Sequence, residues 1–364
     1  MSFNILGLAA LHPSYLVDQK AAAEFAYPLS CSSEKQQRTL SALYARTRIK
    51  KRSSVLLEET GGKPTHAFYR SPGNTKDQGP ATSLRMQRYE RFAGKIATRA
   101  CRQALDRAAL SPQEITHLVT VTCTGFYAPG FDFEIVRELG LPETIQRTQV
   151  GFMGCQAVLN ALRIASAFAA SDEMARIMIC SVELCSLHFQ YGWHPDRVVS
   201  NALFADGAGA IVGAADGTAD PDGNLWKITG TGSKLLPNSA DAMTWRIGDN
   251  GFVMTLSPRI PELIQRFLPG WIDDWLANFN LSRGQIASWA IHPGGPRILS
   301  AAQKALGLPE TSTRVSRQVL SDYGNMSSAT MIFILERLIS EGAHRPCVAL
   351  GFGPGLTVEG ILIE

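Results

Sequence analysis

Residues 151–157 read GFMGCQA and residues 324–330 read GNMSSAT, and the two stretches share a glycine, a methionine and a small polar position. Each stretch opens a segment of helical composition. The segments, AVLNALRIASAFAA at 157–170 and ATMIFILERLI at 329–339, are apolar on nearly every side. Helices without a polar face belong in the interior, so we expect two buried central helices, each preceded by a similar turn.

Two further pairs of segments repeat in the same order along the chain. Ser111–Glu114 and Ser282–Gln285 each form a capping-box sequence before an apolar run, at 115–122 and 286–291. Residues 204–207 (FADG) and 352–355 (FGPG) are turns that each precede an apolar strand. Strands alternating with helices in two similar halves predict an α/β fold, with two sheets packed around the central helices. We place the halves at residues 1–220 and 221–364.

Composition excludes several classes of function. The chain has 364 residues, of which 45% are hydrophobic and 18% are charged, and its formal charge is only +3, which argues against a nucleic-acid partner. The seven cysteines form no CxxC pair and show no metal-ligand spacing, which predicts a reducing cytoplasm and no metal site. No apolar run is long enough to span a membrane, and the start of the chain, which lacks a basic region, reads as a first strand.

The first half also contains one long amphipathic helix. Apolar positions recur with helical periodicity over residues 82–109, with Thr82 or Ser83 as the candidate cap. The preceding residues, 60–80, contain GGKP, SPGN and DQGP and predict an irregular segment.

Cys155 is the first candidate for chemistry. It lies at the expected start of a buried helix, where unpaired N–H groups and the helix dipole favour a thiolate, the nucleophilic form of cysteine. The alternative is that Cys155 is an inert core thiol, which is the commoner fate of such a residue.

His292 and Asn325 are the next candidates. His292 follows an apolar strand and precedes the turn PGGP, and strand ends facing a crevice are common places for active sites in α/β proteins. Six other histidines, among them His188 and His194, compete with it. Asn325 can equally be a simple turn residue, but the duplication places its loop and the Cys155 loop at equivalent points near the centre.

Four motifs together resemble one enzyme family. GCQA around Cys155, AIHPGGPRIL around His292, DYGNMSSAT around Asn325 and the near-terminal GFGPGLTVE occur in the order found in type III polyketide synthases, the chalcone synthase-like family. The resemblance spans essentially the whole chain. It implies a thiolase-like fold with αβαβα layers, a catalytic triad of Cys155, His292 and Asn325, and a gatekeeper phenylalanine at Phe204.

The resemblance also implies a reaction. An acyl group passes from coenzyme A to Cys155, and malonyl-CoA then loses carbon dioxide while the Nε2–H of His292 and the amide of Asn325 bind the developing enolate oxygen. The enolate attacks the acyl-cysteine, whose oxyanion the Cys155 N–H receives. Repeated cycles and ring closure give a pyrone, a resorcinol or a related aromatic product. Acyl-CoA and malonyl-CoA are the expected partners, with no metal or redox cofactor, and the enzyme is expected to be a homodimer.

The substrate-binding positions follow from the same resemblance. Arg46, Gly295 and Arg297 match the coenzyme A site, although Ala42 stands where family members carry a basic residue. The positions that match the cavity and its gate are Cys123, Thr124, Cys185, Met254, Gly353 and Pro354. Cys123 and Cys185 replace threonines and Met254 replaces a second gatekeeper-like phenylalanine, so we expect a starter different from that of plant chalcone synthases, such as a fatty acyl chain.

Two alternatives stay open. A ketoacyl-acyl-carrier-protein synthase of the type III fatty acid pathway also uses Cys, His and Asn, but it lacks the GFGPG terminus. A catalytically silent thiolase-fold subunit that pairs with an active partner is disfavoured by the intact Cys155, His292 and Asn325.

Overall fold

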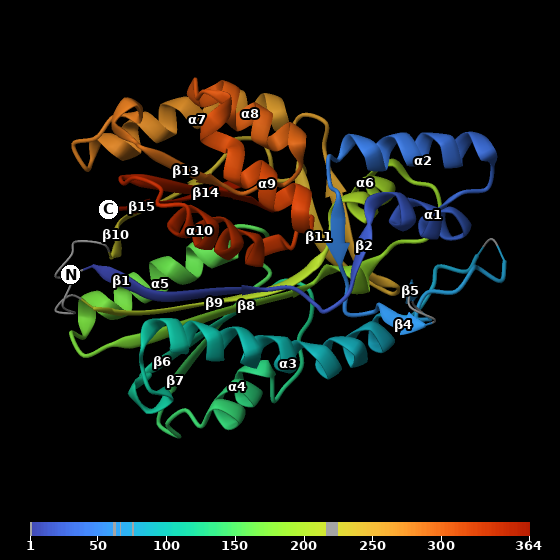
Figure 1. Ribbon diagram of the computed structural model, residues 1–364. Helices are drawn as coiled ribbons and strands as arrows, with labels where there is room; N and C mark the ends of the chain where they lie inside the picture. Colours follow the sequence, from blue (N-terminus) through green and yellow to red (C-terminus); the bar gives the residue numbers. More distant parts are fainter. Residues whose placement is uncertain (1, 61–62, 66, 75, 216–224) are drawn as a thin grey trace.

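The computed structural model describes residues 2–60, 63–65, 67–74, 76–215 and 225–364 (Figure 1). Nine of its strands form one hydrogen-bonded sheet in the order β13-β14-β15-β10-β1-β9-β8-β6-β7. These strands are β1 (Phe3–Leu11), β6 (His117–Thr122), β7 (Gln146–Gly151), β8 (Arg176–Leu184), β9 (Asp206–Ala215), β10 (Trp226–Leu235), β13 (Ser288–Ile291), β14 (Cys347–Gly353) and β15 (Thr357–Ile363). The remaining strands pair as β2 (Leu16–Asp18) with β3 (Lys51–Ser53), β4 (Glu58–Thr60) with β5 (Lys63–Thr65) and β11 (Met243–Gly248) with β12 (Gly251–Leu256).

Helices connect and cover these strands. The α-helices of the described residues are α1 (Gln19–Ser30), α2 (Glu34–Arg46), α3 (Thr82–Ala108), α4 (Phe131–Leu139), α5 (Ala157–Ser171), α6 (Pro195–Leu203), α7 (Ile260–Ala277), α8 (Pro296–Leu306), α9 (Arg314–Tyr323) and α10 (Thr330–Ser340). Short 3-10 turns lie at Pro112–Glu114, Cys185–His188, Arg283–Gln285, Glu310–Thr313 and Ser327–Ala329. None of the helices that the structure describes combines the length and the apolar composition needed to cross a membrane.

Strand pairing confirms the duplication that the sequence predicts. In the first half β6 runs parallel to β8, while β8 with β9 and β9 with β1 are antiparallel. In the second half β13 runs parallel to β14, while β14 with β15 and β15 with β10 are antiparallel. The expectation of two separate sheets is wrong in one respect: β1 pairs with β10 where Phe3–Ile5 face Trp226–Ile228, which joins the sheets along one edge. The proposed boundary at residue 220 lies outside the described residues.

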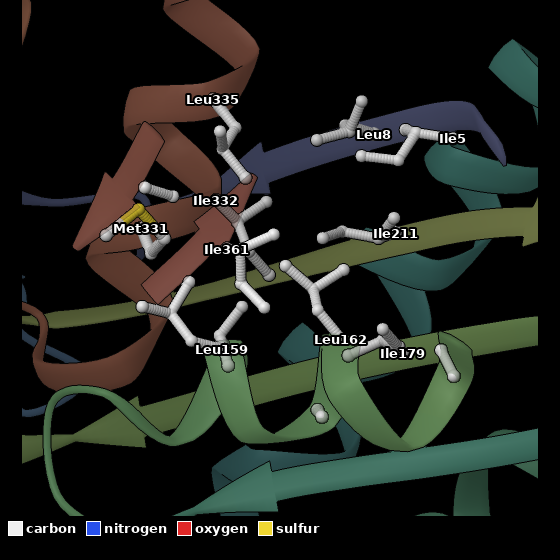
Figure 2. Packing of buried hydrophobic residues seen from close by; sticks show 14 of the residues in the cluster. Ile5, Leu8, Leu159, Leu162, Ile179, Ile211, Met331, Ile332, Leu335 and Ile361 are labelled. Carbon is white, nitrogen blue, oxygen red and sulfur yellow. The ribbon is translucent and has the colours of Figure 1, made fainter. Parts of the chain in front are cut away.

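The helices divide the molecule into layers. Figure 1 shows α3 and α4 outside one part of the sheet, α7 and α8 outside the other, and α5 and α10 between the two parts. Leu162 of α5 and Ile332 of α10 are fully buried and pack in one cluster with Ile211 of β9 and Ile361 of β15 (Figure 2). Burying each such side chain contributes roughly 2 kcal/mol. The predicted thiolase-like αβαβα arrangement with buried central helices is therefore present.

Both predicted capping boxes are present, but the predicted cap of the long helix is not. The amide of Ser111 donates to Glu114 at 2.7 Å and that of Ser282 donates to Gln285 at 2.9 Å, so both capping boxes form. The long helix is α3, but Thr82 does not cap it. Its hydroxyl instead donates to the Gly248 carbonyl and accepts the Gly251 N–H, which fastens the β11–β12 hairpin to α3.

Candidate active site

The Asn325 turn pairs through backbone hydrogen bonds with the chain on either side of Phe204, at the end of α6. The Asn325 N–H donates to the Leu203 carbonyl at 2.9 Å, and the Ala205 N–H donates to the Asn325 carbonyl at 2.9 Å. Arg52 reinforces this junction, because its guanidinium donates to the carbonyl of Phe204 at 2.9 Å and to that of Asn201 at 2.6 Å. The gatekeeper candidate and the asparagine candidate are thus held side by side.

Cys155 lies just before α5 and is almost completely buried, at 8% exposure. The preceding Gly154 has a φ of 82°, and a Cβ on it would lie 2.2 Å from Cδ of Pro354. Only glycine fits this position, for both its backbone conformation and its close contact. The near-terminal GFGPG motif therefore packs directly against the Cys155 loop.

The sulfur of Cys155 differs from the thiolate that its position predicts. Burial raises the pKa of the Cys155 thiol to about 12, while hydrogen bonds from the side chains of Ser327 and Asn325 partly oppose that increase in pKa. Desolvation outweighs the start of the helix here, because the charged form loses its water in a closed site. In the unliganded protein Cys155 rests as a neutral thiol.

His292 directly follows β13 and is fully buried. Its Nε2 lies 2.8 Å from the Ser327 carbonyl oxygen, which can only accept, so Nε2 carries the proton. The ring atom expected to donate to substrate is therefore already engaged, and Nδ1 is buried without a partner among the described residues. Burial lowers the pKa of His292 to about 4, so the imidazole is neutral at pH 7.

Ser327 connects all three candidates, and the sequence did not single it out. Its side chain bonds to the Cys155 sulfur, its carbonyl accepts from His292, and its N–H donates to Asn325 Oδ1 at 2.8 Å. Ser327 has a φ of 48°, a left-handed conformation that is uncommon outside glycine. This strained turn lets one residue contact all three.

A cavity of about 400 Å³ opens in front of Cys155. Its lining includes Cys155 and six of the positions that the sequence predicted: Cys123, Thr124, Cys185, Phe204, Met254 and Pro354. His292 and Asn325 do not line it and lie behind Ser327. Of the other predictions, Gly353 packs against Gln156, and Gly295 faces Leu203. Arg46 at the end of α2 and Arg297 in the first turn of α8 are exposed and lie outside the lining.

Glu183 is a buried carboxylate beside the site that the sequence reasoning missed. It is fully buried and accepts from the Cys123 N–H at 3.0 Å, the Thr124 hydroxyl at 2.8 Å and the Ser328 hydroxyl at 2.5 Å. Burial raises its pKa despite these donors. The available signal was a carboxylate near the end of the strand RIMICSVEL, after a run of uncharged, mostly apolar residues.

A group of aromatic side chains forms one wall of the cavity. His188 stacks on Phe252 at 4.1 Å and meets Trp245 edge-on at 5.5 Å. The His188 Nε2–H donates to the Thr124 carbonyl at 2.7 Å, and the Phe252 N–H donates to its Nδ1 at 3.0 Å. His188 therefore has a structural role in this wall, because it joins Thr124 to Phe252 through its two ring nitrogens. Trp245 carried no sequence signal, because the β11–β12 hairpin reaches the cavity only through tertiary packing.

A layered fold in which a buried cysteine and Ser327 line one cavity, with a histidine and an asparagine hydrogen-bonded to Ser327, is typical of a condensing enzyme of the thiolase class. Comparison with known proteins makes this more specific. Residues 2–217 match the family model for chalcone and stilbene synthases, N-terminal domain, and residues 227–364 match that for the C-terminal domain. The chain belongs to the chalcone and stilbene synthase family and is a type III polyketide synthase, an acyltransferase that condenses coenzyme A thioesters.

Individual relatives agree with this assignment. The chain is 32% identical over 365 residues to the alpha-pyrone synthesis polyketide synthase-like Pks18 of Mycobacterium tuberculosis, covering 99% of this chain and 90% of that protein. The crystal structure of PKS-I from the brown alga Ectocarpus siliculosus matches with a TM-score of 0.91 at 30% identity, covering 100% of this chain and 98% of the other. The C-terminal type III polyketide synthase domain of Steely1 from Dictyostelium matches with a TM-score of 0.88 at 25% identity, covering 100% and 99%.

The protonation state of Cys155 can be tested in the unliganded enzyme. Because the pKa of its thiol is raised to about 12, its thiolate fraction should rise about tenfold per pH unit between pH 6 and pH 9. The rate of iodoacetamide alkylation at Cys155, followed by peptide mass spectrometry, should rise in parallel. Half-exposed Cys31 provides the internal control for reagent reactivity. A rate that is flat over this range would instead indicate a stable thiolate–imidazolium pair.

Proposed function

We propose that this enzyme loads an acyl group from coenzyme A onto Cys155, extends it with malonyl-CoA units and releases a cyclised product, with His292 and Asn325 completing the catalytic group. The observation that carries the proposal is that Ser327 lines the same cavity as Cys155 and hydrogen-bonds both His292 and Asn325, which brings the three candidates together beside a space that can hold substrate. The match over nearly the whole chain favours this reaction over that of a ketoacyl-acyl-carrier-protein synthase or a silent subunit.

Loading begins from the neutral thiol. As the Cys155 sulfur attacks the thioester carbon, its proton passes to neutral His292, whose unpartnered ring nitrogen can accept it. The carbonyl oxygen becomes an oxyanion that the Cys155 N–H receives, and the coenzyme A thiolate leaves with a proton. A buried imidazole with a pKa of about 4 returns a proton readily, which suits a transient carrier.

Extension uses the groups that loading sets free. In the resting site a hydrogen bond from the Asn325 side chain lowers the pKa of the Cys155 thiol, and acylation turns this sulfur into a thioester sulfur, which is a much weaker hydrogen-bond acceptor. The Asn325 amide is then available to the thioester oxygen of malonyl-CoA, where negative charge develops as carbon dioxide leaves. A donor placed there can lower the barrier by about 3 kcal/mol. The resulting enolate attacks the acyl-cysteine, and the thiolate of Cys155 is regenerated.

These roles predict separable defects. Cys155→Ala should form no acyl adduct when mixed with acyl-CoA, as read by intact mass. Asn325→Ala should keep some adduct but release carbon dioxide from labelled malonyl-CoA at least about 100-fold more slowly, because it loses the oxyanion donor. His292→Ala should form the adduct at least about 100-fold more slowly, because it loses the proton carrier of the loading step. Carbon dioxide release at the wild-type rate by Asn325→Ala, or loading at the wild-type rate by His292→Ala, would remove that residue from the step assigned to it.

The product we propose is an α-pyrone, because a relative at 32% identity is named for alpha-pyrone synthesis. A pyrone needs only a short poly-β-keto chain whose enol oxygen closes on the terminal thioester. The tight wall of His188, Phe252 and Trp245 beside Cys155 favours such a short extension, because its aromatic rings fill space that a longer folded intermediate would need.

The starter we propose is a fatty acyl chain. Away from the aromatic wall the cavity is lined by apolar side chains of α1 and of the segment after β3, among them Ala22, Phe25, Leu56 and Leu57. An alkyl chain gains from burial there, at roughly 0.8 kcal/mol per CH₂ group.

Filling this part of the cavity should shorten the starters that the enzyme accepts. Ala22→Trp should retain activity with acetyl-CoA and lose at least about tenfold in kcat/KM with dodecanoyl-CoA, through lost burial of several CH₂ groups. Ala45→Trp, at an exposed position of α2, is the matched control. Product analysis over a panel of acyl-CoAs measures both, and an unchanged chain-length profile in Ala22→Trp would place the alkyl chain elsewhere.

We also propose a homodimer in the cytoplasm that takes acyl-CoA and malonyl-CoA through a lip containing Arg46, Gly295 and Arg297, without a metal or redox cofactor. Support for the dimer comes from Phe126, Phe152 and Met153, which expose apolar side chains next to the Cys155 loop at 48%, 38% and 40%.

Free cysteines throughout the described chain agree with a reducing compartment. We keep residues 1–220 and 221–364 as the two structural halves.

The dimer can be tested by light scattering. The wild type should show twice the 39.5 kDa chain mass at micromolar concentration, whereas Met153→Asp should shift towards the monomer because it places a charge in an apolar interface. Met174→Asp, at another exposed apolar position of 67% exposure, serves as the control. A wild-type mass of one chain would contradict the proposal.

A further inference from the structure

Cys123 is a second thiol at the site, and it binds the residue that precedes the nucleophile. The Gly154 N–H donates to Cys123 Sγ at 3.1 Å, and the Cys123 S–H points to the Gly154 carbonyl oxygen at 3.6 Å. One side chain, only 3% exposed, therefore engages both backbone polar groups of Gly154. The Ala157 N–H at the start of α5 also donates to that carbonyl, at 3.0 Å.

Fixing the Gly154 carbonyl fixes the direction of the next N–H. In a planar trans peptide the C=O and the following N–H point in opposite directions. Because the Gly154 C=O is directed at Cys123 and Ala157, the Cys155 N–H is turned away from both. In the proposed reaction this N–H receives the oxyanion when the acyl group is bound to the Cys155 sulfur.

The backbone of Cys123 is itself anchored from two sides. Its N–H donates to Glu183 on β8 at 3.0 Å, and its carbonyl accepts the indole N–H of Trp245 on β11 at 2.7 Å. The four hydrogen bonds of Cys123, two from its backbone and two from its thiol, therefore link β8, the hairpin of the second half and the Cys155 loop. A side chain that only filled space would not make the two thiol bonds.

We propose that Cys123 is a positioning residue that aims the Cys155 N–H at the oxyanion, with Trp245 holding Cys123 in place. The proposal rests on the proposed role of Cys155 as the acyl carrier. It assigns Cys123 a function beyond the shape of the cavity, because the sulfur acts on the backbone of the nucleophile loop as well as facing substrate. It also gives the second half of the chain, through Trp245, control over the geometry of the first.

The test compares three substitutions at Cys123 in the full-length enzyme with one acyl-CoA starter. Cys123→Ala and Cys123→Val remove the hydrogen bonds, whereas Cys123→Ser keeps both a donor and an acceptor. We expect kcat to fall about 10- to 100-fold in the Ala and Val variants with KM within about threefold of wild type, and the Ser variant to recover to within about fivefold. Thermal unfolding checks that the variants are folded.

The outcomes separate the two proposals. Wild-type kcat in folded Cys123→Ala and Cys123→Val, or a Ser variant as slow as the Ala variant, overturns the positioning role while the acyl adduct on Cys155 persists. Absence of any adduct on Cys155 in the wild type overturns the proposed function and this inference together. A change confined to KM, with kcat unaltered, would show that Cys123 acts on substrate binding and would also overturn the positioning role.

Trp245→Phe tests the second link, since it keeps an aromatic ring and removes the indole N–H. We expect kcat to fall about fivefold. The double variant Cys123→Ala/Trp245→Phe should have a kcat within about twofold of that of Cys123→Ala, because both changes act through the orientation of the Gly154 carbonyl. Fully multiplicative losses in the double variant would separate Trp245 from the action of Cys123.

Discussion

The active site depends on a short backbone pairing between the two halves, in which Asn325 binds the chain on either side of Phe204. Hydrogen bonds of 2.9 Å in both directions join the start of the α10 turn to the end of α6. Neither half can carry out the proposed reaction alone, because the first half carries the thiol of Cys155 and the second half carries Asn325, Ser327 and His292. Backbone groups set this junction, so it tolerates changes in side chains while it fixes the distance between the halves.

Burial gives this site its chemistry and also its resting state. Enclosing Cys155 and His292 strengthens every hydrogen bond near them, yet it disfavours any isolated charge, so the pKa of the thiol rises and that of the imidazole falls. In the proposed reaction, charge appears only when substrate supplies a carbonyl oxygen to carry it and donors such as the Cys155 N–H are already in place. That mechanism couples reactivity to occupancy of the cavity.

Much of the fold could be predicted because similar segments repeat in the same order in the two halves of the sequence. The paired turns, the capping boxes at Ser111 and Ser282, and the apolar helices predicted two halves of one topology, and the strand pairing has that pattern. The edge where β1 meets β10 was not predictable, because register between distant strands leaves no local signature. The cap of α3 was misassigned because Thr82 hydrogen-bonds to a hairpin more than 160 residues away.

Site residues that belong to sequence motifs could be predicted, whereas those brought to the site by tertiary packing could not. Cys155 and Asn325 stand in recognisable turns, but the sign of the pKa shift at Cys155 reverses once the enclosing side chains are known. Ser327, Glu183 and Trp245 escaped notice because their importance lies in what they contact from different elements. Trp245 shows this most clearly: its indole, on a hairpin of the second half, binds the carbonyl of Cys123 at the end of β6. In the proposed mechanism the duplicated halves therefore have different roles: the first presents the nucleophile, and the second constrains the backbone around it.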